Sequence, residues 1–117
     1  MTDERQYQGI SPEELQQELD QLWQDLQRDD SAISEEAREA GIDLSEVRRF
    51  KRPEDALEVK PGGAHLDPLL GAVIIAVAPM AAKTASHIII SLWDKVLLPW
   101  IQHRRGAGTL TEASGNK

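Results

Sequence analysis

The side chains that most often carry chemistry are few in this 117-residue chain, and they do not form a recognisable site. Cysteine is absent, which excludes disulfides, thiolate catalysis and cysteine-ligated metal centres. The three histidines, His65, His87 and His103, include no short pair, such as i and i+4, that would ligate a metal ion. We therefore expect neither a metal site nor a cofactor.

Two pairs of adjacent carboxylates, Glu13–Glu14 and Glu35–Glu36, are the other catalytic candidates. Each pair closely follows a serine, Ser11 or Ser34, that can begin a helix. Acidic side chains at such a position are explained by capping and by the helix dipole. No Ser–His–Asp arrangement or phosphate-binding glycine loop is visible. The sequence therefore predicts a protein that is not an enzyme.

Polar side chains recur at helical spacing in the C-terminal half. They occupy one face of a helix over residues 80–98, opposite an apolar face, and Pro99 ends the pattern. This polar stripe consists of Lys83, Thr84, His87, Ser91, Asp94 and Lys95. One interpretation is a solvated face of a core helix. Another is a stripe that lines a water-filled lumen formed by several copies in a membrane.

The segment from Leu66 to Ile101 is the most apolar part of the chain, with 24 apolar residues among 36. A 23-residue helix over residues 70–92 has the length to span a bilayer. Its apolar side chains contribute about −3 to −5 kcal/mol of insertion free energy, which Lys83 offsets by about 2.5–3.5 kcal/mol. The candidate membrane- or partner-binding residues are Leu70, Val73, Ile74, Ile75, Val77, Ile88, Ile89, Leu92, Trp93, Leu97 and Trp100.

The N-terminal part predicts an amphipathic helix with Ser11 as its N-cap, Pro12 in its first turn and Glu14 completing a capping box. Its apolar stripe is Leu15, Leu19, Leu22, Trp23 and Leu26. Because an isolated helix of this length is marginal in water, the stripe needs a partner. That partner is either the rest of the same domain or another molecule for which the stripe is a docking surface.

A second helix is expected from Ser34 to a glycine stop at Gly41, and a third short element over residues 42–50. A basic cluster, residues 48–52, then surrounds Phe50. It either complements the acidic segment before it or contacts an acidic partner or lipid surface. Residues 56–59 can form a short strand or a short helix, which periodicity does not decide.

Charge is divided unevenly along the chain, whose total is −7. Residues 1–47 carry 14 acidic and 3 basic side chains, a net −11, whereas the remainder is basic. An acidic protein lacks the basic face that nucleic-acid binding needs, so nucleic acid is excluded as a partner. The polar N-terminus has no signal-peptide core, which predicts a cytoplasmic protein that moves to the inner membrane in the membrane-binding case.

The C-terminal half carries a resemblance to a known group of proteins. A glycine-led apolar run from Gly71 to Ala82 is followed by Trp93 and then by the ending Trp100-Ile101-Gln102-His103-Arg104-Arg105. This pattern resembles small effector-associated components of bacterial conflict systems, which act in anti-phage defence and programmed cell death. The resemblance implies a non-catalytic adaptor or a membrane-active effector.

Together these observations predict an all-α fold: short amphipathic N-terminal helices and one long or Pro79-kinked hydrophobic C-terminal helix. The expected parts are an acidic helical region (1–47), a basic connector (48–67), a hydrophobic helical region (68–105) and a flexible tail (106–117). The leading hypothesis is an effector-associated protein whose segment 66–101 binds or enters a membrane, for example as an oligomeric pore. The alternative is a helical interaction module that buries this segment against itself, a second copy or a protein partner.

Overall fold

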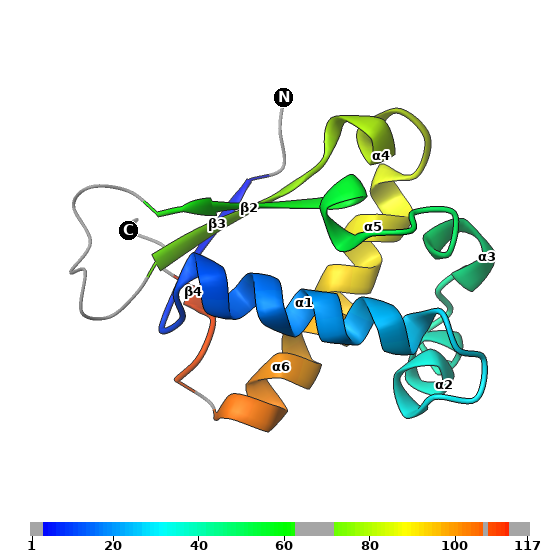
Figure 1. Ribbon diagram of the computed structural model, residues 1–117, viewed down its shortest axis with the longest axis horizontal. Helices are drawn as coiled ribbons and strands as arrows, with labels where there is room; N and C mark the ends of the chain where they lie inside the picture. Colours follow the sequence, from blue (N-terminus) through cyan, green and yellow to red (C-terminus); the bar gives the residue numbers. More distant parts are fainter. Residues whose placement is uncertain (1–3, 63–71, 107, 113–117) are drawn as a thin grey trace.

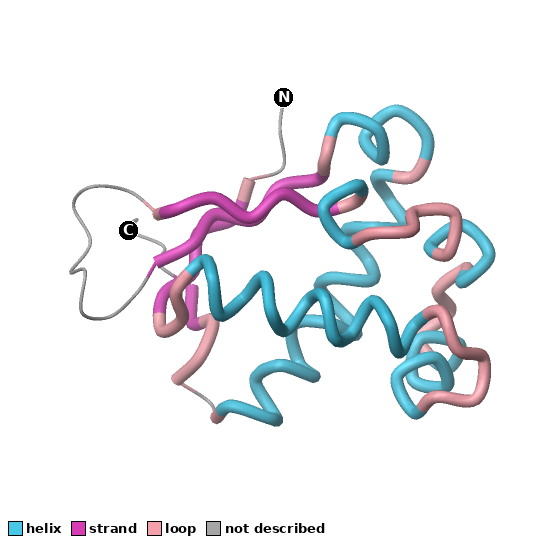
Figure 2. The backbone as a smooth tube through the Cα atoms, viewed as in Figure 1, coloured by secondary structure: helices cyan, strands magenta, loops and turns pink. Residues whose placement is uncertain are grey.

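The computed structural model describes residues 4–62, 72–106 and 108–112. A four-stranded antiparallel sheet lies against helices, as Figure 1 shows. The predicted all-α fold is therefore wrong, and the protein has a mixed α/β fold. In Figure 2 the strands are gathered on one side of the molecule, and the helices lie below and beside them.

The sheet joins segments from both ends of the chain in the order β2-β3-β1-β4. Its strands are β1 (Arg5–Gln8), β2 (Leu57–Pro61), β3 (Ala72–Val77) and the two-residue β4 (Thr111–Glu112). β3 is a central strand, because it pairs with β2 on one side and with β1 on the other. The N-terminal segment, which was expected to belong to an acidic helical region, thus supplies a strand beside the most apolar one.

β3 corrects the prediction of a hydrophobic helix over this region. Four of its six residues, Val73, Ile74, Ile75 and Val77, are β-branched, and such side chains favour strands. An apolar run of this length cannot be assigned to a strand or a buried helix by periodicity. The register places Val73 opposite Tyr7 and Ile75 opposite Val59. Two segments distant in the sequence therefore supply the hydrogen-bond partners that make this run a strand and not a helix.

The first helix, α1 (Pro12–Leu26), forms as predicted. The Ser11 hydroxyl accepts a hydrogen bond from the Glu14 amide, and the Glu14 carboxylate accepts one from the Ser11 amide, both at 3.1 Å. The helix packs beside β2 and α2 (Ala32–Glu39). Its apolar stripe is buried in the core.

The second helix begins three residues earlier than predicted. Ser31 is its N-cap, whereas Ser34 lies inside it, fully buried, with its hydroxyl donating to the Arg28 carbonyl at 2.7 Å. Gly41 ends the helical segment with φ of +81°. The next elements are α3 (Leu44–Val47) and η1 (Pro53–Asp55), which lead into β2.

The C-terminal segment is not one long helix. α4 (Pro79–Thr84) stops at Ala85, whose φ of −145° and ψ of 25° are not helical. α5 (Ser86–Leu92), the π-helical η2 (Trp93–Leu97) and α6 (Leu98–Arg105) then follow one another without interruption. In the described part of the chain, no helix is both long enough and apolar enough to cross a membrane.

Candidate functional site

The structure places most of the apolar residues that were predicted to bind a membrane or a partner inside the protein core. Ile74, Val77, Ile88 and Trp100 are partly buried, and Leu70 lies outside the described residues. The other six are at most 2% exposed: Val73, Ile75, Ile89, Leu92, Trp93 and Leu97. The apolar segment is thus largely used within the chain itself, which corrects the prediction of a membrane-associated apolar helix.

The predicted docking stripe on α1 is also buried in the core. Each of its members, Leu15, Leu19, Leu22, Trp23 and Leu26, is 1% exposed or less. The Trp23 indole N–H donates to the Phe50 carbonyl at 2.7 Å, which ties α1 to the chain before η1. This stripe holds the fold together and is not exposed to a second molecule.

The polar stripe lies at the surface but is divided among three elements. Lys83 and Thr84 belong to α4, His87 and Ser91 to α5, and Asp94 and Lys95 to η2. Asp94 forms an ion pair with Arg5 of β1. The break at Ala85 means that the six side chains do not share the face of one helix.

Arginines of the basic cluster and of α6 form ion pairs with the acidic N-terminal region. Arg48 contacts the Asp29 carboxylate at 3.2 Å, and Arg38 of α2 contacts the same carboxylate at 3.0 Å. The Arg105 Nε lies 2.8 Å from the Glu18 carboxylate, whose side chain is only 11% exposed. These ion pairs join α6 to α1 and the segment after α3 to the end of α1.

A groove of about 640 Å³ lies between the end of α1, α2 and the η2–α6 segment. We call it the α2–α6 groove. Figure 1 shows α2 and α6 on the lower side of the molecule, with α1 above them. The lining residues are Asp25, Glu36, Lys95, Val96, Pro99, Trp100, His103 and Arg104.

The two walls of this groove carry opposite charges. Asp25 and Glu36 make one wall acidic, and the η2–α6 wall carries the basic side chains Lys95, His103 and Arg104. Between them lie Val96, Pro99 and the partly buried ring of Trp100. The groove can therefore hold an apolar side chain that has charged groups on either side of it.

The π-helical turn shapes the basic wall. The Leu98 amide bonds to the carbonyl of Trp93, five residues earlier, and Pro99 has no N–H to continue that pattern. The wide turn accommodates the proline while Lys95 and Trp100 stay on the groove side of the helix. Such turns are common at functional sites in proteins.

A smaller cavity of about 360 Å³ lies between α1 and residues 51–54. Its lining includes the polar or charged side chains of Asp20, Gln24, Lys51 and Glu54. The described residues hold no group of three or more His, Asp or Glu side chains placed to bind a metal ion. The α2–α6 groove, which combines an accessible aromatic ring with charges of both signs, is the stronger candidate site.

No protein-family model, curated protein or solved structure matches this chain. The site therefore has to be interpreted from its own geometry.

Two residues of the groove were singled out in the sequence: Lys95 in the polar stripe and Trp100 as a candidate membrane- or partner-binding residue. His103 and Arg104 appeared in the ending that carries the resemblance, and the acidic wall was not predicted. One signal for the acidic wall is Asp25 in the last turn of α1, because a carboxylate there is disfavoured by the helix dipole. Glu36 offers no such signal, since only the folded chain brings it near η2 and α6.

Proposed function

We propose that this protein is a non-catalytic interaction module that binds another protein at the α2–α6 groove. The observation that supports the proposal is the position of Trp100, between an acidic and a basic wall, in a groove of about 640 Å³. A non-catalytic adaptor is also the role that the resemblance to bacterial conflict systems implies.

The composition of the groove favours a protein as its ligand. Tryptophan and arginine are enriched among the residues that dominate binding energy at protein interfaces, and both line this groove. Interfaces place apolar contacts at the centre and charged groups at the rim, which is the arrangement of Pro99 and Trp100 between Glu36 and Lys95.

The membrane-binding hypothesis was drawn from a continuous apolar helix. In the described part of the chain, residues 72–77 form a strand instead, and the apolar faces of α5 and η2 are in the core. The interaction-module alternative remains, and its binding surface moves from the apolar segment as a whole to the groove.

A selection experiment tests the proposal. A phage-displayed library of random peptide segments is screened against the immobilised protein, and the affinities of enriched peptides are measured by isothermal titration calorimetry. We expect the enriched sequences to share an apolar or aromatic residue next to charged residues. Trp100→Ala should weaken binding by at least roughly 30-fold, the effect of losing an interface residue worth about 2 kcal/mol.

Met80→Ala is the matched control, because Met80 is a large apolar residue, 63% exposed, on α4 and not in the groove. Its affinities should equal those of the wild type. The proposal is wrong if no peptide is enriched, or if enriched peptides bind Trp100→Ala as tightly as the wild type while circular dichroism shows both proteins folded.

A further inference from the structure

We infer that the partner at the α2–α6 groove is a second copy of this chain, related by a twofold axis, with α6 of each copy seated in the groove of the other. This inference rests on the proposed function and specifies its partner. It is carried by the opposite charges of the two groove walls.

A twofold interface must be self-complementary, because each surface patch meets its own copy turned by 180°. The groove satisfies this condition for charge. With the axis through the region of Trp100, Glu36 of one copy faces Lys95 of the other, and the same pair forms again on the opposite side of the axis. The interface therefore contains two equivalent attractive pairs and brings the two Trp100 rings to its centre.

The face of α6 has the composition that an acidic groove wall would bind. Pro99, Trp100, His103 and Arg104 stand at positions i, i+1, i+4 and i+5, which lie on one side of a helix. The acidic wall of the groove presents the carboxylates of Asp25 and Glu36. The basic and aromatic ligand that fits this groove is thus displayed by the chain itself.

Charges at the groove are still available for a partner. Among the residues that the structure describes, neither Glu36 nor Lys95 belongs to an ion pair, and both are exposed. Arg104 differs, because it already contacts Glu18 at 3.5 Å. Glu36 and Lys95 are therefore the pair whose charges can be changed without breaking a contact inside the described fold.

The test is a charge exchange between two singly substituted proteins, read by size-exclusion chromatography with light scattering. We expect the wild type to reach twice the monomer mass of 13.0 kDa as its concentration rises. Glu36→Lys and Lys95→Glu should each shift dimerisation to at least about tenfold higher concentration, since each places like charges opposite one another twice. An equimolar mixture should restore dimerisation, because the introduced lysine of one chain then faces the introduced glutamate of the other.

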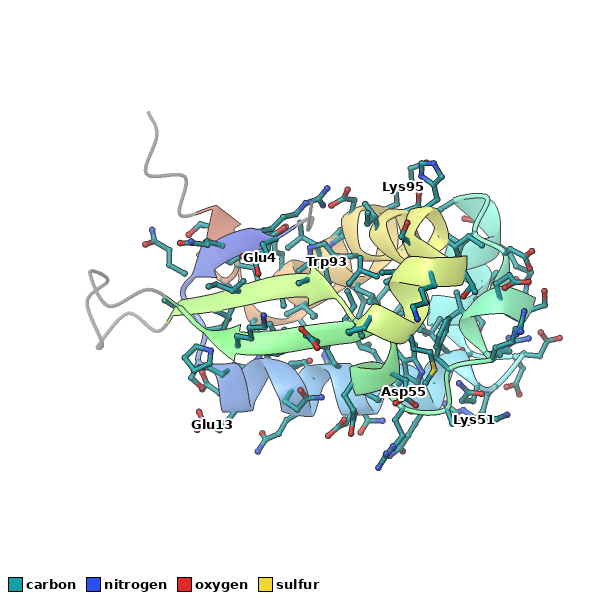
Figure 3. All side chains as sticks on the ribbon, turned by 90° about the horizontal axis from the view of Figure 1, so that it is seen from above. Glu4, Glu13, Lys51, Asp55, Trp93 and Lys95 are labelled. Carbon is teal, nitrogen blue, oxygen red and sulfur yellow. The ribbon has the colours of Figure 1, made fainter. Side chains whose placement is uncertain are left out.

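Two controls test whether a loss of dimerisation comes from the groove itself, and not from any change of surface charge or from unfolding. Glu54→Lys and Lys51→Glu make the same charge changes at the smaller cavity, and Figure 3 shows Lys51 on the side of the molecule opposite Lys95. These variants should dimerise like the wild type. Thermal unfolding should show that all four variants are folded, and Trp100→Ala should also remain a monomer where the wild type is dimeric.

Three outcomes would overturn the inference: a wild type that stays monomeric at all concentrations, single variants that dimerise normally, or a mixture that fails to recover. The peptide selection is independent of them. If the wild type is monomeric but still selects peptides in a Trp100-dependent way, the groove binds a different protein and only the second-copy inference fails. If both experiments fail, the proposed function fails with it.

Discussion

The indole N–H of Trp93 donates a hydrogen bond to the hydroxyl of Tyr7 at 2.9 Å, although the two residues are 86 positions apart. Both side chains are 1% exposed, and their ring centroids lie 5.6 Å apart. This pair fastens β1 to η2, and so links the sheet to the helix that forms the basic wall of the groove. The neighbouring ion pair of Arg5 and Asp94 joins the same two elements.

Tyr7→Phe should destabilise the protein by about 1–3 kcal/mol, because it leaves the buried indole N–H of Trp93 without its acceptor. Urea unfolding followed by circular dichroism measures the change. Gln6→Ala, at an exposed position on the same strand, is the control and should change stability by less than about 0.5 kcal/mol. Equal stabilities for Tyr7→Phe and the wild type would show that this hydrogen bond contributes nothing.

Glu18→Gln should weaken the attachment of α6 to α1. The carboxylate of Glu18 is 2.8 Å from the Nε of Arg105, and because the arginine is one-third exposed we expect a loss of only about 1 kcal/mol. Asp20→Asn removes an exposed charge from the same helix and should leave the unfolding free energy within about 0.5 kcal/mol of the wild type. A result in which both variants behave alike contradicts a specific role for Glu18.

The capping box makes stability depend on pH. The hydrogen bond from the Ser11 backbone amide, helped by the Ser11 side chain and the charge of Arg105, holds the pKa of Glu14 below its usual 4.5. The folded state therefore binds this proton less readily than the unfolded state. The stabilisation is present above pH 4.5 and is lost as the pH falls through the lowered pKa.

Glu14→Gln tests this dependence. The stability difference between wild type and variant, measured by thermal unfolding at a series of pH values, should be constant near neutral pH and shrink in acid below the unfolded-state pKa. Glu13→Gln, which removes a carboxylate from the same helical turn and leaves the capping hydrogen bonds in place, is the matched control. A difference for Glu14→Gln that persists unchanged into strong acid would show that ionisation of Glu14 is not the cause.

Two glycines with positive φ should respond differently to substitution by alanine. Gly41 has φ of +81° and open space where a Cβ would lie, so Gly41→Ala should cost only the backbone strain, about 1–2 kcal/mol. At Gly9, with φ of +95°, a Cβ would overlap the carbonyl oxygen of Gly108. Gly9→Ala should therefore lower the urea midpoint further than Gly41→Ala, and the reverse order would contradict the close approach of these two chain segments.

An element could be predicted from the sequence when the interactions that define it are local in the chain. α1 was predicted because its signals are local: Ser11, Pro12 and Glu14 define its beginning, and the stripe from Leu15 to Leu26 defines its buried face. The beginning of α2 was misplaced because Ser31 and Ser34 are both plausible caps. Ser34 became an interior residue once its hydroxyl found the carbonyl of Arg28.

The sequence by itself determined the capped first helix, its apolar stripe and the residues of the basic and aromatic ending. Only the tertiary structure decided that residues 72–77 are a strand, because an apolar run of six residues becomes a strand when β1 and β2 satisfy its backbone on both sides. The tertiary structure also decided that the groove forms, because Glu36 and Trp100 are 64 positions apart and no local pattern relates them. Their proximity is a consequence of packing α2 and α6 on the same core.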